Sequence, residues 1–317
     1  MSTAHALQHL EPIAPGHSGP AAEFLAYRLG TDAFLRGVDL LNEAVGGNIT
    51  HGMLLNALWC LELGKTVAPR ESLVLPTEWN RPMGIHELGR ALGLPYSTAH
   101  RQLRQMVQSG LASRTDSGAV AISQVFTDSA AGRSFRRRAT ASFVHLIVSW
   151  HRLGYLAGDV RALEQEGSLS PAQEDVVFRA GIEALLQCLL LTARFYDDLV
   201  TGLVFKLVAV SNIRHLLSGP QSVPAMAMAV PDEMRRPISV YNAARSLHMP
   251  YETTRRISKQ LLARNVFKQG ESSGLVVTAD VHKQKENAEA QLASFKTMAA
   301  SVAQLAYAGL NLELRPR

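Results

Sequence analysis

Apolar residues recur at three- and four-residue spacing along most of the chain, which predicts a mainly helical protein. The same series of elements is predicted twice. In the first series we expect helices at about 22–45 and 50–65, a helix-turn-helix at 84–109 and a closing helix at about 128–157. The second series has its counterparts at 174–196, 199–217, 239–264 and 281–308. Alternating apolar segments with a Ser-Gly turn, at 111–125 and 266–280, predict a two-stranded wing after each helix-turn-helix.

The chain also repeats its own residues. Residues 81–98 and 236–253 align without a gap at an offset of 155 residues. An upstream block, which aligns Arg28 and Asp32 with Arg179 and Glu183, has an offset of 151, and a downstream block has an offset of 152. Three collinear blocks favour an internal duplication over chance similarity between helices.

This duplication predicts the domain organisation. We expect a flexible N-terminal arm at 1–22, a first unit at 23–157, a linker at 158–173, a second unit at 174–310 and a C-terminal tail at 311–317. The expected fold is mainly α with small β-wings: two tandem winged helix-turn-helix units arranged as a single-chain pseudo-dimer with a helical core. The apolar helices of the two units would pair in the middle.

Each helix-turn-helix has the residues that its geometry requires. In the first, Leu88 and Leu92 give the apolar face of the leading helix, and Gly93 suits the left-handed turn that ends it. Pro95 then fixes the start of the second helix, at about 95–109. In the second motif His248 stands where Gly93 stands in the first, and histidine adopts the left-handed conformation less readily.

The outward faces of the second helices, at 95–109 and 250–264, are the candidate DNA-reading surfaces. Arginine binds guanine through two hydrogen bonds, Ser and Thr reach bases or phosphates, and Glu accepts from cytosine. The candidates in the first motif are Ser97, Thr98, His100, Arg101 and Arg104, and those in the second are Glu252, Thr253, Arg255, Arg256 and Lys259. A solvated helix face is the plainer explanation of such charges, but here they occupy groove-facing positions twice.

The stretches 54–126 and 205–280 resemble winged helix-turn-helix transcriptional regulators, and the long flanking helices make them look most like the MarR-like group. The residues that carry the resemblance are 85–103, followed by Ser109-Gly110-Leu111. The resemblance implies major-groove contact by the second helix and a wing contact by Arg114 with the 116–118 turn. The corresponding wing contact would come from Lys268 with the 271–274 turn. Such regulators are usually homodimers of a single unit, whereas this chain is fused.

Divergence between the two copies leads to a further hypothesis. A homodimer reads a palindrome because its DNA-reading parts are identical, but Ser97 and His100 correspond here to Glu252 and Arg255. We therefore expect an asymmetric double-stranded DNA site with two unlike half-sites. The protein would act as a monomeric pseudo-dimer or as a homodimer of it.

Composition agrees with this interpretation without deciding it. The chain has 317 residues, 47% of them hydrophobic and only 6% aromatic, and a formal net charge of +5. Cys60 and Cys188 lie in apolar helical patterns, as buried thiols of a reducing cytoplasm would. Polar residues and prolines interrupt the N-terminal segment, and no uninterrupted apolar run of membrane-spanning length occurs, so we expect a cytoplasmic, bacterial nucleoid-associated protein that contacts no membrane.

A basic cluster begins the first closing helix. It contains Arg133, Arg136, Arg137 and Arg138, and the second copy has no equivalent. Contact with DNA phosphates and a solvated basic helix end explain the cluster equally well at this stage.

Other classes of function fit the sequence less well. The chain lacks a phosphate loop, a nucleophile elbow and a zinc-protease motif, so we expect no enzyme, no cofactor and no metal; His145 and His151 have poor ligand spacing on a helix. A tandem winged-helix adaptor that binds protein, or a replication initiator-type protein, stays as an alternative. A small-molecule effector is an open possibility, and Trp59, Trp79 and Trp150 belong to the core or to its pocket.

Overall fold

The computed structural model describes residues 20–314, except 68–71, 73, 77–78, 80, 166, 197, 218–229 and 271–272. Most of the predicted N-terminal arm, residues 315–317 of the tail and the start of the second wing turn therefore lie outside the described residues. So do parts of the segments that precede each helix-turn-helix.

Elements of the first half follow one another in the predicted order. They are α1 (Pro20–Ala44), α2 (Ile49–Thr66), α3 (Ile85–Ala91), α4 (Tyr96–Gln108), β1 (Ala112–Arg114), β2 (Val120–Ile122), α5 (Gln124–Thr127) and α6 (Ala130–Arg152). Helix α1 starts within the range expected for the arm, because residues 20–22 are already helical.

The second half has the same order. Its elements are α8 (Pro171–Phe195), α9 (Leu199–Ile213) with the 3-10 turn η3 (Arg214–Leu217), η4 (Asp232–Met234), α10 (Val240–Ser246), α11 (Tyr251–Ala263), β4 (Phe267–Gln269), β5 (Leu275–Val277), α12 (Ala279–Lys283), α13 (Lys285–Ala303) and η6 (Gln304–Ala308). Helices α3 and α10 both have 7 residues, and α4 and α11 both have 13.

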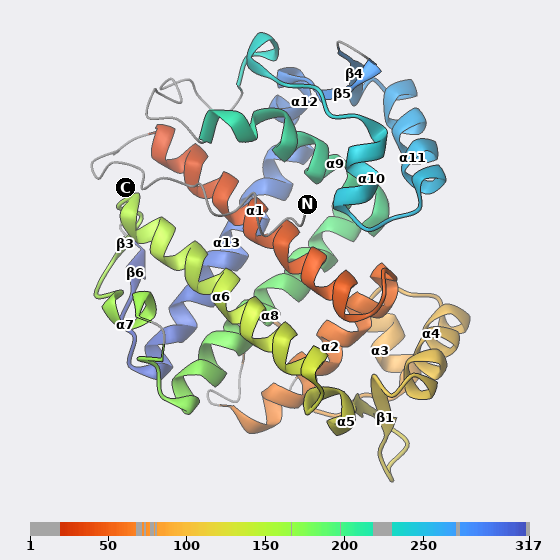
Figure 1. Cartoon of the computed structure of the whole chain (residues 1–317), viewed down its shortest axis with the longest axis vertical. Coiled ribbons are helices and arrows are strands. Elements are labelled where there is room, and N and C mark those ends of the chain that lie inside the picture. The colour runs from red at the N-terminus through yellow and green to blue at the C-terminus, as the bar shows by residue number, and fades with distance from the viewer. Residues whose placement is uncertain are drawn as a thin grey trace.

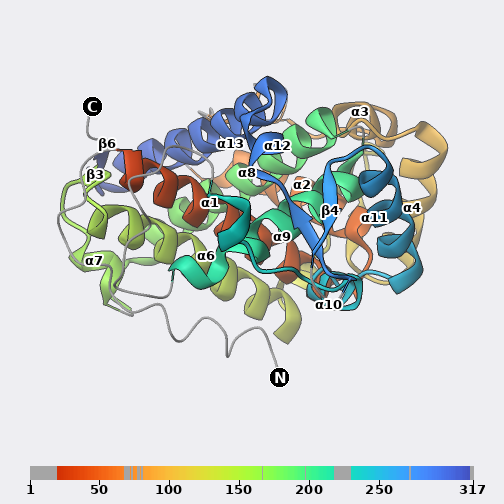
Figure 2. The ribbon, with the colours of Figure 1, turned by 90° about the horizontal axis from the view of Figure 1, so that it is seen from above.

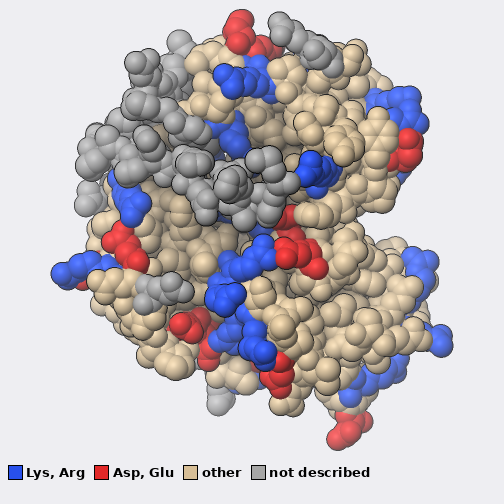
Figure 3. Space-filling model, in the orientation of Figure 1, with Lys and Arg blue, Asp and Glu red and all other residues tan. Residues whose placement is uncertain are grey.

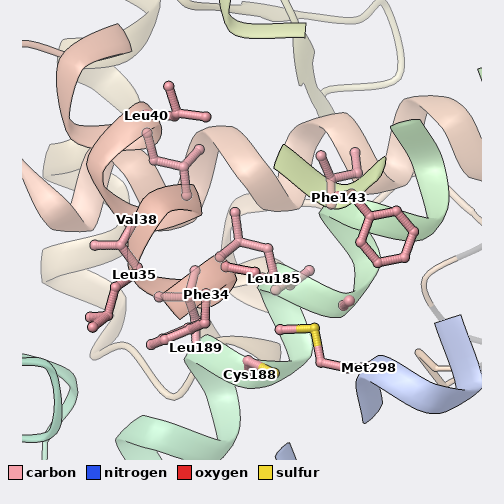
Figure 4. Close-up of a cluster of buried hydrophobic side chains, with 14 of the residues drawn as sticks. Phe34, Leu35, Val38, Leu40, Phe143, Leu185, Cys188, Leu189 and Met298 are labelled. Carbon is pink, nitrogen blue, oxygen red and sulfur yellow. The ribbon is translucent and has the colours of Figure 1, made fainter. Parts of the chain in front are cut away.

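The core is a bundle in which helices from both halves interleave (Figure 1). Helix α2 packs on α8, and α9 packs correspondingly on α1. Helix α6 contacts α8, and α13 contacts α1. Figure 4 shows Phe34 and Val38 of α1 near Leu185 and Leu189 of α8, with Phe143 and Met298 from the two closing helices beside them. The hydrophobic core is thus continuous across the two halves.

Helix α8, and α9 together with the η3 turn (Leu199–Leu216), are long and apolar enough to cross a membrane by length and composition. In both, however, 67% of the most apolar window is buried inside the fold. Such burial is what a core helix requires, and the two helices supply much of the centre of the bundle.

Two features differ from the sequence-based expectation. Neither closing helix is continuous: a separate short helix, α5 or α12, precedes each, and the first ends at Arg152. The expected linker at 158–173 contains α7 (Arg161–Glu164), and β3 (Leu156–Ala157) pairs antiparallel with β6 (Glu313–Leu314) in the expected tail. A strand pair 157 residues apart in sequence, counted from Leu156 to Glu313, is a tertiary contact that no local pattern announces.

All three tryptophans and both cysteines are buried. Trp150 donates a hydrogen bond from Nε1 to Ala26 O at 3.0 Å, which joins α6 to α1. Burial and the nearby Glu183 carboxylate raise the pKa of the Cys60 thiol well above its usual value, and burial raises the pKa of Cys188 to about 11. Both thiols therefore remain protonated and behave as small core residues.

One ion pair lies inside the core. Arg179 and Glu183 of α8 have side chains that are 2% exposed, and Arg179 Nε donates to Glu183 Oε1 at 2.7 Å. Glu183 Oε2 also accepts from Ser72 Oγ at 2.7 Å and from Gln304 Nε2 at 3.1 Å. The carboxylate therefore connects segments from both halves and satisfies a cation that would be costly to bury alone.

We predict that Glu183→Ala lowers the free energy of unfolding by about 3–5 kcal/mol, because it leaves the buried Arg179 without its counter-charge. Glu43→Ala, which removes the exposed Arg138–Glu43 pair, is the matched control and should cost at most about 1 kcal/mol. Urea unfolding of the full chain, followed by circular dichroism, measures both values. Equal effects of the two substitutions would contradict the assigned role of the buried pair.

Candidate nucleic-acid interface

Each winged helix-turn-helix forms a small body at the surface of the bundle. We call residues 85–122 the first head and residues 240–277 the second head. Helix α4 of the first head and helix α11 of the second lie at the same edge of the molecule in both ribbon views, on the right in Figures 1 and 2. We call α4 and α11 the reading helices. Their common edge is the condition for both to approach one DNA duplex.

In the first head the turn between α3 and α4 is built on close backbone contact. Gly93 has a φ of 67° and Leu94 N donates to Gly89 O at 2.8 Å, which satisfies a helix-end carbonyl. Gly89 faces Ala99 so closely that an added Cβ would lie 2.8 Å from the Ala99 Cβ. Leu88, Leu103 and Met106 are fully buried beneath this junction. Small residues at the contact therefore set the steep angle between the two helices.

The second head has the same left-handed turn, with a histidine in place of the glycine. His248 occupies the left-handed position with a φ of 51°, and its Nδ1 lies 2.9 Å from Asp39 Oδ1 of α1. Asn42 Nδ2, also on α1, donates to Leu247 O at 2.9 Å. Two contacts with the other half thus hold a turn whose histidine is less suited to the conformation than glycine.

On α4, the predicted reading residues lie along the outward face. Ser97, Arg101 and Arg104 are exposed, while Thr98 and His100 are half-buried. The buried stripe of the helix is formed by Ala99, Leu103 and Met106, as its spacing requires. The five predicted residues are therefore available at the surface, and two of them are cations.

On α11, the corresponding charges are partly compensated within the helix. Glu252, Arg256 and Lys259 are exposed, and Thr253 and Arg255 are half-buried. Arg255 Nε donates to Glu252 Oε2 at 2.9 Å, and hydrogen bonding to this carboxylate raises the pKa of Arg255. Arg256 and Lys259 therefore carry most of the positive charge that this helix presents.

Arg114 and Lys268 do not occupy equivalent positions in the two wings, although the sequence comparison predicted that they would. In the first wing Ser113 pairs with Ala121 and Arg114 with Val120. In the second wing Lys268 pairs with Val276 and Gln269 with Leu275. Register makes Ser113 the counterpart of Lys268, so Arg114 and Lys268 project from opposite faces of their strands, although both are exposed. The first wing turn is closed by Gly118 N donating to Thr115 O at 2.9 Å.

Tyrosine opens both reading helices, a repeated feature that the sequence-based search for charged groups missed. Tyr96 is 56% exposed and Tyr251 is 46% exposed, at the equivalent first position of α4 and α11. The Tyr96 ring lies 5.8 Å from that of His86 and 5.7 Å from that of His100. The signal available in the sequence was the aromatic residue directly after proline in both copies.

The basic cluster at the start of α6 is largely engaged with the protein itself. Arg136 forms an ion pair with Asp175 and lies over the Phe178 ring at 5.1 Å. Arg138 contacts Glu43 at 2.7 Å, and Arg133 donates to the Asp128 carbonyl. Arg137 is exposed. Three of the four arginines thus have intramolecular partners, and Arg137 is the member best placed for an external anion.

Exposed cations gather on two lobes at the right edge of the space-filling view, separated by a notch (Figure 3). These lobes lie over α11 and over α4 and its wing. The exposed cations of the two heads include Arg101, Arg104, Arg114, Arg256, Lys259 and Lys268. Among the described residues no group of three or more His, Cys, Asp or Glu side chains has the arrangement of a metal site.

Residues 77–116 match the profile of the IclR helix-turn-helix domain. The matched segment covers α3, α4, β1 and the beginning of the first wing turn. The chain therefore carries an IclR-type helix-turn-helix DNA-binding domain, which supports a winged helix-turn-helix transcriptional regulator. The match is of the IclR type and gives no support to the MarR-like group. Comparisons with curated proteins and with solved structures gave no significant match.

We predict that Gly89→Ala destabilises the first head by about 1–3 kcal/mol, because the new methyl group would force α3 and α4 apart. Gly84→Ala is the control: nothing lies within 4 Å of its added Cβ, and the change should cost less than about 1 kcal/mol. Hydrogen exchange of the α3 and α4 amides reports on this head alone. Unchanged protection in Gly89→Ala would show that the contact does not set the helix angle.

Proposed function

We propose that the protein is a sequence-specific regulator of transcription that binds double-stranded DNA with both heads. The observation that carries the proposal is the pair of outward reading helices, α4 and α11, on one edge of the molecule. The first lies in the segment that matches a DNA-binding domain, and the second has the same length and the same buried stripe. Helices of this kind insert into the major groove with their N-terminal residues nearest the bases.

The proposed architecture is a pseudo-dimer within one chain, with units at 23–157 and 174–310 that arose by duplication. Reciprocal packing supports it: α2 on α8 corresponds to α9 on α1, as in the contacts of a two-fold dimer. Hydrogen bonds from the first half to the second also join the two halves. Arg28 Nη2 donates to Val210 O at 2.9 Å, and Asn56 Nδ2 donates to Ile182 O at 3.2 Å.

The two heads would read unlike half-sites. Arg101 and Thr98 have identical counterparts in Arg256 and Thr253, whereas the other three reading positions differ. The second head presents a Glu252–Arg255 pair where the first presents Ser97 and His100. A carboxylate beside the groove accepts from cytosine N4, which a serine hydroxyl in its place does not do selectively.

We assign base contacts to the ten predicted residues of α4 and α11 and wing contacts to Arg114 and Lys268. Tyr96 and Tyr251 are added as groups that reach the sugar-phosphate backbone beside each reading helix. The protein would act with the DNA in the cytoplasm, as a monomeric pseudo-dimer or a dimer of it, and a small-molecule effector is part of the proposal.

Arg101→Ala and Arg256→Ala should each weaken binding to the best site by about 1–3 kcal/mol and relax the preference at one base position. The two changes should affect different half-sites. Arg137→Ala is the matched control, because loss of a phosphate contact weakens binding almost uniformly across sequences. Affinities for single-base variants of the site measure both effects. An Arg101→Ala protein that bound the best site normally would refute the assignment of α4.

Selection of bound fragments from random DNA should return an asymmetric site with half-sites about one helical turn apart. The triple variant Ser97→Glu, His100→Arg and Arg104→Lys gives α4 the reading residues of α11. We expect this variant to select a more symmetric site, while the wild type does not. A palindrome selected by the wild type, or the same site selected by both proteins, would contradict unlike heads. Absence of any DNA selection would favour the adaptor alternative.

A further inference from the structure

A cavity of about 430 Å³ lies beside the bundle core, between α1, α8, α9, α12 and α13. Its volume is that of a site for a small organic molecule. Aromatic and aliphatic side chains form most of its wall; they include Tyr27, Phe34, Tyr196, Phe205, Phe295 and Met298. A wall of this kind suits an apolar molecular body.

Three buried cations line the same cavity. Arg28 is 7% exposed, Lys206 is 8% exposed and Arg235 is 6% exposed. The Lys206 ammonium lies 3.4 Å from Ser294 Oγ and 5.1 Å from the centre of the Phe34 ring, and no described carboxylate forms an ion pair with it. Arg28 donates to Val210 O and Arg235 to Val230 O, whereas the Lys206 ammonium is compensated least. Burying such a cation is unfavourable unless an anion joins it.

Hydrogen-bond donors around the cavity also lack acceptors. Arg28 Nε, Arg235 Nη1 and His282 Nε2 are buried and have no hydrogen-bond partner in the described part of the chain. The Gln291 side-chain nitrogen lies 3.2 Å from His282 Nδ1, and with this amide as the donor the hydrogen of the neutral imidazole is assigned to Nε2. Burial, with Arg235 and Arg28 nearby, lowers the pKa of His282 to about 3, which keeps this ring a neutral donor.

Each carboxylate near the cavity already has a partner, and Glu289, an exposed residue of the cavity wall, lies 3.9 Å from Lys285 Nζ. Asp32 accepts from Arg214 at 3.2 Å, and Asp232 accepts from Ala279 N at 2.7 Å while lying 3.5 Å from Arg235 Nε. Burial lowers the pKa of Arg28 to about 10 although Asp32 acts in the opposite direction. The protein's own acids therefore leave the positive charge of the cavity incompletely balanced.

The second half of the chain contains residues that can be compared with Arg28 and Asp32. Arg28 and Asp32 align with Arg179 and Glu183. There the arginine and the carboxylate form a buried ion pair at 2.7 Å, and Ser72 and Gln304 complete the hydrogen bonds of Glu183. The same two positions thus form a closed ion pair in one half and a cavity with unpaired donors in the other.

We propose that this cavity binds a small organic anion, a carboxylate with an aromatic or aliphatic body. Arg28, Arg235 and His282 would receive the carboxylate, and the rings of Phe34, Phe205 and Phe295 would cover the apolar part, with Lys206 adding positive charge. Arg235 precedes α10 and His282 belongs to α12, so the anion joins both flanks of the second head to α1. Regulation of DNA affinity by this anion rests on the proposed DNA-binding function, whereas the binding of the anion does not.

Isothermal titration of the full chain with 4-phenylbutyrate and with its neutral amide tests the site. We expect saturable binding of one carboxylate per chain and at least about tenfold weaker binding of the amide, because a charge-assisted hydrogen bond is lost. Arg28→Met and Lys206→Met should each weaken binding of the carboxylate about tenfold while leaving affinity for the amide unchanged. Arg194→Met, which removes an exposed cation from α8, is the matched control and should bind both probes as the wild type does.

Thermal unfolding shows whether each variant is folded. Lys206→Met should fold even if Arg28→Met does not, because Lys206 loses only a long hydrogen bond to Ser294 and its contact with the Phe34 ring. Three results would each overturn the proposal. They are equal affinity for the acid and the amide, equal binding of the carboxylate by the wild type and a folded Lys206→Met variant, and no binding of phenylbutyrate, octanoate or anilinonaphthalene sulfonate. A chain that binds the carboxylate but selects no DNA would contradict the proposed function and leave the anion site standing.

Discussion

Mutual burial of α1 and α8 is the constraint on which the rest of the structure depends. Helix α8 is too apolar to face water, and its cover comes from α2 and α6 of the first half as well as from α9 and α13 of its own. Helix α1 is covered in the reciprocal way by α9 and α13. Neither half could therefore hide its apolar surface alone, and each head is attached to a base that both halves build. Gly37 permits this contact, since an added Cβ would lie 2.8 Å from Leu185 Cδ1.

Local signals in the sequence were sufficient to predict the helix-turn-helix of each head. Gly93 adopts the left-handed φ that ends α3, and Ala99, Leu103 and Met106 form the buried stripe of α4, because both properties depend on residues close in the chain. The β3–β6 pair and the cavity were not predictable in the same way. The pair joins the middle of the chain to its C-terminal part, and the cavity is formed by side chains of five helices, none of which has a distinctive pattern by itself.

Alignment of the two copies was also insufficient to predict the roles of the charged side chains, because each role depends on the partner that the fold brings near. Arg136 and Arg138 belong to a basic run in the sequence, yet both are engaged by carboxylates of other helices. Arg255 is paired within its own helix, and Lys268 is displaced by one strand position from the counterpart of Arg114. Charge counts therefore overstate the likeness of the two heads, and the exposed cations of the reading helices that form no ion pair among the described residues are Arg101, Arg104, Arg256 and Lys259.

On the proposed function, His248 has a consequence for the spacing of the two half-sites. Its contact with Asp39 fixes the turn of the second head to α1, a helix of the other half. The distance and twist between the reading helices are then set by the bundle and not by a flexible connection. An inserted base pair would turn one half-site by about a tenth of a revolution relative to the other, and a rigid frame would have to strain or release a head to follow it. The chain would thus act as a ruler for spacing as well as a reader of sequence.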